Sequence, residues 1–447
     1  MSLKKEKSII IIGAGVGGLS IGTLLVNAGH KVSIYEKTER VGGRTTSIKF
    51  KDHVLDNGFH IMPFYKKSAI YDVLKSANIV SKLKLAIVDE IAFYDGNFHT
   101  YPKGIIDILR MSLIPLKSRL SLLKILLPMA FTSMEKAEEM DQTPLTEVTK
   151  KLDSHSKTFF DAVCMLAFAD TTDHISLGEF ARTIIRANPF KGGTSEFAYP
   201  DMGGYDRISE VMGNYIQENN SSLTLGVSIK KILVKDSKVV GVLLADDTRI
   251  QSDCVIISYP AYHAINQLFD EGIFDDDFVK HTNRLNKTTS VVEVHFALSK
   301  KLDDRQVVFP VGENYTSKGI FFISNITPSV SPQGEHLIIV GTPVKPEETD
   351  DKQRIKEIVS KMKSELSAIY PEFDSSLLWE RPMAWKLVEA VVKEPGLVWK
   401  NKMPHSVPHV KGLFFVGDST ISYGIGTDSA AHSAILAYPK ISKFLVS

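Results

Sequence analysis

Three glycines near the start of the chain have the spacing of a phosphate-binding turn. Gly13, Gly15 and Gly18 form a G-x-G-x-x-G pattern that also encloses Gly17. In such a turn the first glycine permits a tight bend, the second lets the backbone approach a pyrophosphate, and the third lets a helix pack against the strand. Glu36 follows at about the 20-residue spacing expected for a carboxylate that binds a ribose hydroxyl. These residues predict a dinucleotide site.

The residues around the glycines predict the elements that hold them. Residues 9–12 are a short β-branched apolar run, which is typical of a buried parallel strand. Residues 19–28 have the pattern of a helix, and residues 31–35 have that of a second strand. This unit would place the phosphates at the helix N-terminus, where free N–H groups and the helix dipole favour an anion.

Composition limits the classes of protein that the chain can belong to. Its 447 residues are enough for two or more folding units. Lys and Arg total 53 against 52 for Asp and Glu, so no overall charge attracts nucleic acid, and we expect no such partner. Cys164 and Cys254 lack the spacing of a disulfide framework or a zinc site. We therefore expect no metal and a reducing, cytoplasmic location.

No segment has the pattern of a membrane-spanning helix, because no uninterrupted apolar run reaches about 18 residues. The N-terminus resembles the start of a secretory signal, since lysines precede the apolar residues 9–12. The glycines at 13–18 interrupt that apolar stretch, and the dinucleotide pattern explains the same residues better.

Two further segments carry a resemblance to a known group of proteins. Val-Gly-Gly-Arg at 41–44 follows Glu36 closely, and Leu-Phe-Phe-Val-Gly-Asp at 413–418 lies near the end of the chain. Together with the glycine turn, they resemble the flavin amine oxidase and phytoene desaturase superfamily. The resemblance implies bound FAD, with Asp418 at its ribityl or pyrophosphate region. Residues 424–428 would pass under the isoalloxazine, with the following helix dipole aimed at the C2 carbonyl.

The resemblance covers the whole chain and implies its fold. Tyr-Pro-Asp-Met-Gly-Gly at 199–204 is similar to the family's Pro-x-Gly-Gly element, and Val227 occupies the usual adenine contact. The implied fold is α/β, with a Rossmann-like FAD-binding domain of the glutathione-reductase type and a second α+β substrate domain. We expect the FAD-binding domain at residues 1–75, 196–284 and 395–447, and the substrate domain, a helical part plus a mixed sheet, at 76–195 and 285–394.

The cofactor is expected to be bound without a covalent link, because no Cys or His falls in the C-terminal flavin segment, residues 417–428. The expected cofactor-binding residues are Gly13, Gly15, Gly17, Gly18, Glu36, Lys37, Gly42, Gly43, Arg44, Gly58, Phe59, His60, Val227, Gly417, Asp418, Gly426, Thr427 and Asp428. Asp428 departs from the family pattern, in which a small or apolar residue is common there. It would accept a hydrogen bond from flavin N3–H or cap the last helix.

Two departures from the amine oxidase pattern weaken the resemblance of this sequence to that branch of the superfamily. Those oxidases often carry a lysine in the strand that corresponds to residues 290–298, and here Glu293 lies near that position. They also tend to carry a tyrosine shortly before the last helix, where Ile425 stands here. The segment 55–60, Leu-Asp-Asn-Gly-Phe-His, instead resembles that of carotenoid isomerases and retinol saturases. His60 is therefore a candidate proton donor or acceptor, and the alternative is a structural histidine.

The resemblance to the phytoene desaturase branch implies hydride transfer between an isoprenoid or polyene C–H bond and flavin N5. Desaturation, isomerisation and saturation remain open, and the hydrophobic substrate is unnamed. One alternative is an amine oxidase that releases hydrogen peroxide. Another is a prenyl-binding carrier of the same fold without redox chemistry.

Residues 103–131 are basic and rich in leucine, with Leu116, Leu120, Leu123 and Leu127 at helical spacing. A helix of this kind can lie on an anionic membrane and admit a lipid substrate. The alternative is a helix whose leucine face covers the substrate domain. We therefore expect either peripheral membrane contact through 103–131 or ordinary packing there.

Overall fold

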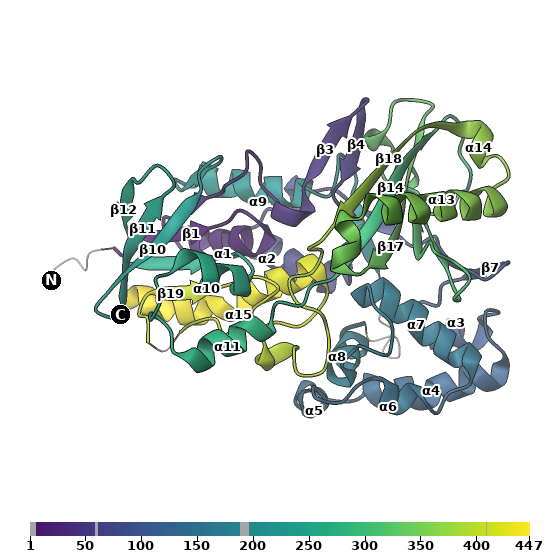
Figure 1. Ribbon diagram of the computed structural model, residues 1–447, viewed down its shortest axis with the longest axis horizontal. Helices are drawn as coiled ribbons and strands as arrows, with labels where there is room; N and C mark the ends of the chain where they lie inside the picture. The colour runs from purple at the N-terminus through teal and green to yellow at the C-terminus, as the bar shows by residue number, and fades with distance from the viewer. Residues whose placement is uncertain (1–5, 59–60, 188–195, 408) are drawn as a thin grey trace.

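The computed structural model describes residues 6–58, 61–187, 196–407 and 409–447 (Figure 1). The two ends of the chain and the middle strands form one part, with α1 and α15 beside the sheet. The second part holds a larger sheet, covered by α13, and a group of helices from α3 to α8 (Figure 1).

A five-stranded parallel sheet forms the first part, in the order β19-β13-β1-β2-β9. Its strands are β1 (Ile9–Ile12), β2 (Ser33–Tyr35), β9 (Ser222–Thr224), β13 (Cys254–Ile257) and β19 (Leu413–Phe415). All four residues of β1 are buried because both faces of the sheet are covered. Ile9 and Ile11 pack with α1 (Val16–Asn27) and α15 (Gly426–Val446), whereas Ile10 and Ile12 pack toward a second sheet.

That second sheet has three strands, β10 (Ile229–Lys235), β11 (Lys238–Leu244) and β12 (Arg249–Gln251). The apolar residues between 223 and 234 do not form one strand, because β9 ends at Thr224 and β10 begins at Ile229. Between them the backbone turns to bind the segment after β2. Gly226 N donates to Thr38 O at 2.9 Å, and Val227 N donates to Glu36 O at 2.9 Å.

The second part is built on a seven-stranded sheet of order β18-β14-β17-β16-β15-β6-β7. Its strands are β6 (Ile91–Tyr94), β7 (Phe98–Thr100), β14 (Ser290–Leu298), β15 (Val307–Pro310), β16 (Gly319–Phe321), β17 (His336–Val344) and β18 (Leu377–Trp385). β14 is buried along its whole length. Val292, Val294 and Phe296 form a core with α13 (Lys352–Ile369), which leaves Glu293 and His295 on the opposite face.

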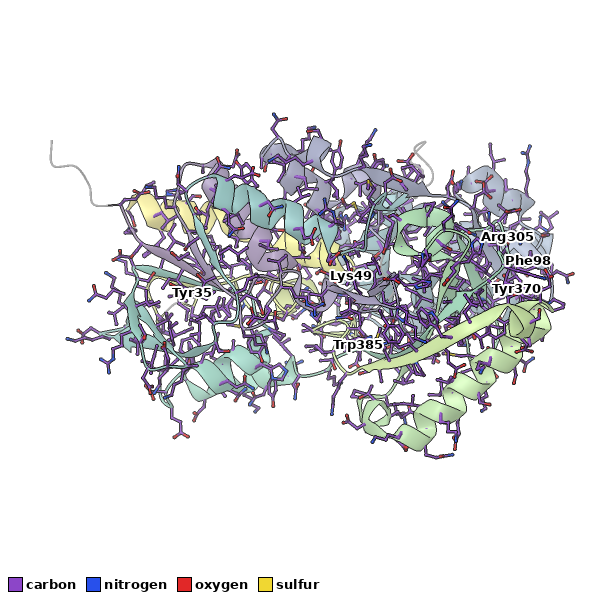
Figure 2. All side chains as sticks on the ribbon, turned by 90° about the horizontal axis from the view of Figure 1, so that it is seen from above. Tyr35, Lys49, Phe98, Arg305, Tyr370 and Trp385 are labelled. Atoms are coloured by element: carbon purple, nitrogen blue, oxygen red, sulfur yellow. The ribbon has the colours of Figure 1, made fainter. Side chains whose placement is uncertain are left out.

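Trp385, at the end of β18, lies near the middle of the molecule, whereas Phe98, Arg305 and Tyr370 gather at the end of the second part (Figure 2). The Arg305 guanidinium lies 3.9 Å from the centre of the Phe98 ring. The strands of the seven-stranded sheet all fall within residues 76–195 and 285–394. Those of the parallel sheet fall within the remaining segments. The division into two folding domains itself stays a prediction.

Helices dominate residues 103–187. They are α3 (Ile105–Arg110), α4 (Leu116–Ala130), α5 (Met134–Glu139), α6 (Thr146–Thr149), α7 (Ser154–Phe168) and α8 (Leu177–Ala187). The remaining named elements are β3 (Ser47–Phe50), β4 (His53–Asp56), α2 (Ala69–Ser76), β5 (Leu85–Val88), β8 (Phe197–Pro200), α9 (Arg207–Glu218), α10 (Ala261–Leu268), α11 (Asp276–Arg284), α12 (Ile323–Ile326) and α14 (Phe373–Ser376). In the part of the chain that the structure describes, no helix combines the length and apolarity needed to cross a membrane.

Candidate functional site

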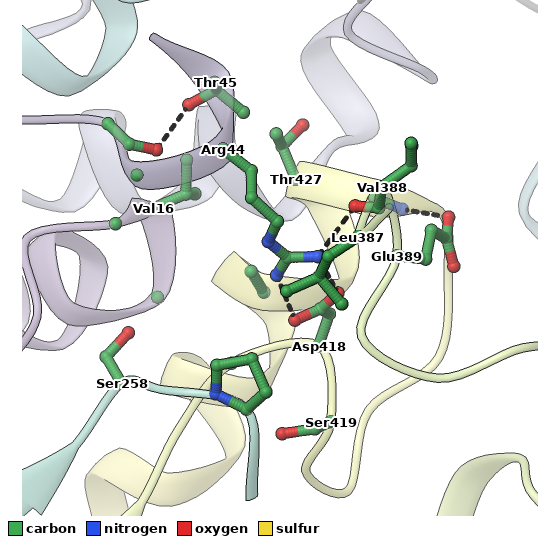
Figure 3. A pocket seen from close by; sticks show the side chains of 18 of the residues that line it. Val16, Arg44, Thr45, Ser258, Leu387, Val388, Glu389, Asp418, Ser419 and Thr427 are labelled. Carbon is green, nitrogen blue, oxygen red and sulfur yellow. Dashed lines mark hydrogen bonds and ion pairs between the residues drawn. The ribbon is translucent and has the colours of Figure 1, made fainter. Parts of the chain in front are cut away.

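A cavity of about 530 Å³ lies where the parallel sheet meets the second part, and its walls come from both. Figure 3 shows part of its lining. Most of the predicted cofactor residues lie on these walls. They are Gly13, Gly15, Gly17, Glu36, Lys37, Gly42, Gly43, Arg44, Val227, Gly417, Asp418, Gly426 and Thr427. Segments that are far apart in the sequence are thus brought together around one space.

The glycine turn leaves room for a ligand at the start of α1. Gly13 has a φ of +99°, and a Cβ atom there would lie 2.8 Å from the carbonyl oxygen of Ser258. Gly15 precedes α1, and a Cβ atom on it would meet nothing within 4 Å among the described residues. Gly18 is not on the cavity wall, because it faces Gly13, whose carbonyl oxygen a Cβ atom would overlap. Gly18 therefore supports the site by letting α1 pack closely against the turn.

Glu36, directly after β2, lines the cavity and is hydrogen-bonded to the glycine turn. Its Oε2 accepts a hydrogen bond from Ala14 N at 2.9 Å. Its Oε1 accepts from the amide and the hydroxyl of Thr38, both at 2.9 Å. A carboxylate can accept about four hydrogen bonds, so it retains capacity for a ribose hydroxyl. Nearby, the Lys37 ammonium lies 5.4 Å from the centre of the Tyr259 ring, which also lines the cavity.

Arg44 and Asp418 form a bidentate salt bridge on the cavity wall (Figure 3). Arg44 Nη1 and Nη2 donate to Asp418 Oδ2 and Oδ1 at 2.9 and 2.6 Å. Arg44 Nη1 also donates to Val388 O at 2.7 Å, and Ala390 N donates to Asp418 Oδ2 at 2.8 Å. Burial alone would raise the pKa of Asp418, but the Arg44 guanidinium lowers the pKa to about 2. The carboxylate is therefore charged and held by protein groups.

The N-terminus of α15 faces the same cavity. Gly426 N donates to Glu389 Oε1 at 2.9 Å, and the hydroxyls of Thr427 and Tyr205 lie 3.1 Å apart. Glu389, which lines the cavity, lies 2.8 Å from the buried ammonium of Lys393. No local sequence pattern pointed to Glu389, because its contact with Gly426 depends on the packing of distant segments. A positive helix end at this point favours negative charge in the cavity.

Asp428 does not take either of its expected roles. It is fully buried and is absent from the cavity wall, and α15 has no side-chain cap in the structure. Its Oδ1 accepts from the backbone N–H of Ala69 at 2.6 Å, and its Oδ2 accepts from Arg186 Nη1 at 2.5 Å. Ala69 is the first residue of α2, so Asp428 satisfies the N-terminus of a neighbouring helix. The expectation failed because that contact depends on how α15 packs against α2.

Gly58 also lies off the cavity wall, and it is held by a residue of the seven-stranded sheet. Gly58 N donates to Glu293 Oε1 at 2.9 Å, and Trp385 Nε1 donates to the same oxygen at 2.6 Å. Glu293 is fully buried, and burial raises its pKa to about 8. Within the described structure, Glu293 Oε2 has no hydrogen-bond partner. Phe59 and His60 lie outside the described residues, so the role of His60 stays a prediction.

The remaining wall of the cavity is mainly apolar. Side chains of the second part and of the adjoining segments contribute Ile61, Pro63, Met165, Leu166, Phe309, Phe321, Pro343, Leu387 and Ile425. Lys318 is the charged residue among them. Cys164 and Cys254 are buried elsewhere and do not line the cavity. Within the described ranges, no group of three or more His, Cys, Asp or Glu residues could hold a metal ion. The arrangement suits a dinucleotide and an apolar ligand side by side.

Comparisons with known proteins agree with this geometry. A family model described as flavin containing amine oxidoreductase matches residues 16–437. The 4,4'-diapophytoene desaturase of Methylomonas sp is 22% identical over 358 residues, which cover 74% of this chain and 69% of the relative. The phytoene desaturase of Fusarium fujikuroi is 24% identical over 394 residues, covering 76% of this chain and 66% of the relative. The alignments thus span about two thirds of each desaturase.

The fold is shared with solved structures. An oxidoreductase from Methanosarcina mazei superposes with a TM-score of 0.77 at 20% identity, covering 97% of this chain and all of that one. This likeness shows the fold alone, which is a mixed α/β architecture with a Rossmann-like parallel sheet.

Proposed function

The chain belongs to the family of flavin-containing amine oxidoreductases, and on that premise we propose that the cavity holds FAD without a covalent link. The glycine turn and the start of α1 would bind the pyrophosphate, Glu36 the adenosine ribose, and Val227 the adenine. The start of α15 would face the flavin ring. Among the described residues that line the cavity there is no cysteine or histidine, the side chains that most readily form a covalent flavin link.

The proposed reaction is desaturation of an isoprenoid or polyene. Bound flavin would supply the chemistry by accepting a hydride from a C–H bond at its N5 atom. The apolar side chains on the cavity wall, which include Met165, Leu166, Phe309 and Phe321, would bind the hydrocarbon and exclude water. The helix dipole at the start of α15 would stabilise the negative charge that reduction places on the cofactor. The names of the two relatives favour removal of hydrogen over its addition.

One observation carries this proposal: a single cavity is lined by two kinds of residue. We call the part lined by the glycine turn, Glu36 and Asp418 its dinucleotide half, and the part lined by apolar side chains such as Met165, Phe309 and Phe321 its apolar half. An amine substrate is less suited to it, because Ile425 lies on the wall and Glu293 is committed to Gly58 and Trp385. A prenyl carrier without redox chemistry would not need the assembled turn, Glu36 and helix end.

The direct test is anaerobic mixing of the purified yellow protein with two substrate panels. We expect bleaching of the flavin absorbance by linear isoprenoid hydrocarbons such as phytoene, and no bleaching by primary amines and polyamines. Acid precipitation should release free FAD into solution. Bleaching by an amine, with peroxide formed in air, would overturn the desaturase proposal. A colourless protein that does not take up FAD would favour the carrier.

We also propose that α3 and α4 contact a membrane surface. Large apolar side chains are exposed on and beside them, namely Ile106, Leu109, Leu116, Leu120 and Phe131. Leu123 is buried and Leu127 is half-buried, so only part of the leucine stripe is exposed. Arg110, Lys117 and Lys124 are exposed on the same two helices, which suits anionic headgroups.

A further inference from the structure

Lys318 introduces a positive charge into the apolar half of the cavity. The other charged residues on the wall lie in the dinucleotide half, and they are Glu36, Lys37, Arg44, Glu389 and Asp418. Lys318 directly precedes β16, and its backbone N–H donates to Gly341 O at 2.9 Å. Phe309 and Phe321, on the neighbouring strands β15 and β16, line the same cavity. The sheet therefore fixes this lysine beside apolar side chains.

The Lys318 side chain also reaches the surface. Its Nζ donates to the carbonyl oxygen of Gly312, an exposed residue of the β15–β16 connection, at 3.2 Å. A residue that lines the cavity and bonds to an exposed carbonyl lies where the cavity meets solvent. Burial lowers the pKa of Lys318, so its ammonium is already partly removed from water.

No carboxylate in the described parts of the chain lies within 4.0 Å of Lys318 Nζ. Three acidic groups act on the charge of Lys318. One of them, Glu313, is exposed, and the other two, Glu365 and Asp161, are occupied by other donors. Glu365 accepts the backbone N–H groups of Thr316 and Ser317 at 2.6 and 2.8 Å. Asp161 pairs with Lys157 at 2.8 Å. The ammonium thus keeps donor capacity for a ligand, since it has three protons and one described acceptor.

We infer that Lys318 binds the anionic head, a carboxylate or a phosphate, of an amphipathic substrate whose hydrocarbon tail lies in the apolar half of the cavity. The inference rests on the proposed function, because it adds a polar end to the proposed hydrocarbon substrate. Such a ligand would enter tail first and stop with its head at the mouth. Lys318 would then set how far the chain penetrates toward the dinucleotide half.

Equilibrium dialysis of the flavin-loaded protein tests the inference with three probes that share a twelve-carbon tail and differ only in their head group. The probes are dodecanoate, dodecyl phosphate and dodecanol, each below its micelle concentration. A hydrogen bond to a charged group is typically worth about tenfold to a hundredfold in affinity. We expect the wild type to bind at least one anion that much more tightly than the alcohol. Preference for dodecanoate or for dodecyl phosphate identifies the head.

Lys318→Met should remove the preference for the anion and leave the affinity for dodecanol unchanged. The control is Lys300→Met, which removes an exposed lysine paired with Glu372 outside the cavity. The control should behave as the wild type does. Equal affinity of the wild type for anions and alcohol, or an anion preference that persists in Lys318→Met, would overturn the inference. Dialysis needs no redox step, so flavin bleaching by neutral isoprenoids separately decides the proposed function.

Discussion

Arg44 and Asp418 are separated by 374 positions in the sequence, yet they form a bidentate salt bridge on the cavity wall. Through this pair the segment after the glycine turn is joined to the segment after the last strand. Val388 and Ala390 bond to the same two side chains, which adds the connection that follows β18. This pair is therefore one of the contacts that join the beginning and the end of the chain at the cavity.

Replacing Arg44 with Met should destabilise the protein by about 1–3 kcal/mol, because the buried Asp418 carboxylate loses its bidentate partner, although solvent partly screens the 34% exposed Arg44 side chain. Urea unfolding at neutral pH measures this change. Asp418→Asn should cost less, since an amide can still accept from Arg44 and Ala390. The surface pair of Lys82 and Glu218 offers a control, and Lys82→Met should change stability by less than about 1 kcal/mol. A loss for Arg44→Met as small as that of the control would contradict the role assigned to the pair.

Glu36→Ala should weaken FAD binding by about tenfold to a hundredfold, because hydrogen bonds to a charged acceptor are worth about 1.5–3 kcal/mol. Calorimetric titration of the flavin-free protein with FAD measures the affinity. Glu36→Gln keeps one acceptor oxygen and should lose less. Since Glu36 also binds Ala14 and Thr38, thermal unfolding without FAD should be recorded for both variants. Unchanged FAD affinity in Glu36→Ala would show that this carboxylate does not contact the ribose.

The raised pKa of Glu293 predicts a pH dependence of stability. Its pKa is about 8 in the fold, whereas the ordinary pKa of a glutamate side chain is 4.5, so between these values the folded state holds a proton that the unfolded state has lost. The free energy of unfolding therefore falls as pH rises through this window, by up to about 1.4 kcal/mol per pH unit. Glu293→Gln cannot ionise and should lack this component. Its stability relative to the wild type should increase from pH 5.5 to pH 7.5.

Urea unfolding at the two pH values tests the prediction. Glu380→Gln on the neighbouring strand β18 is the control, since its carboxylate is partly exposed and pairs with Lys363. Parallel pH profiles for the wild type and Glu293→Gln would mean that Glu293 is already ionised at neutral pH.

Binding to anionic liposomes should depend on the exposed faces of α3 and α4. Each basic residue near such a surface contributes about 1 kcal/mol, and salt screens this contribution. Changing Arg110, Lys117 and Lys124 together to Glu should abolish flotation with phosphatidylserine liposomes at low salt. Arg119 is kept, because its guanidinium holds the carbonyls of Ile114 and Leu109. Flavin content should stay that of the wild type. A triple variant that floats equally well would leave these helices as ordinary packing surface.

The sequence predicted those elements whose own residues show a clear pattern of spacing or apolar periodicity. The glycine turn, β1, α1 and β2 follow from spacing and periodicity over a few residues. The pattern missed β18, because Leu377–Trp385 contains Glu380, Arg381 and Pro382 and alternates only weakly. The apolar residues 319–326 have the composition of one strand, yet β16 ends at Phe321 and α12 begins at Ile323.

The parts of the site that depend on long-range packing could not be predicted. Glu389 meets Gly426, and Glu293 meets Gly58, only after the two sheets have assembled. Asp428 illustrates the same limit, since the residue type permits several roles and its burial against α2 selects one. The type of a short polar residue does not reveal which distant residue it will contact in the fold.

The walls of the cavity come from the first strand, the middle of the chain and the last helix, so an occupant touches segments that no single stretch of sequence connects. Cofactor supply and chain folding are consequently linked equilibria. A ligand that binds only the folded state adds stability that grows with the logarithm of its free concentration, by about 2.7 kcal/mol at a hundred times its dissociation constant. Molecules synthesised when flavin is scarce would unfold more often and be degraded sooner. The cellular abundance of this protein should therefore follow the flavin supply.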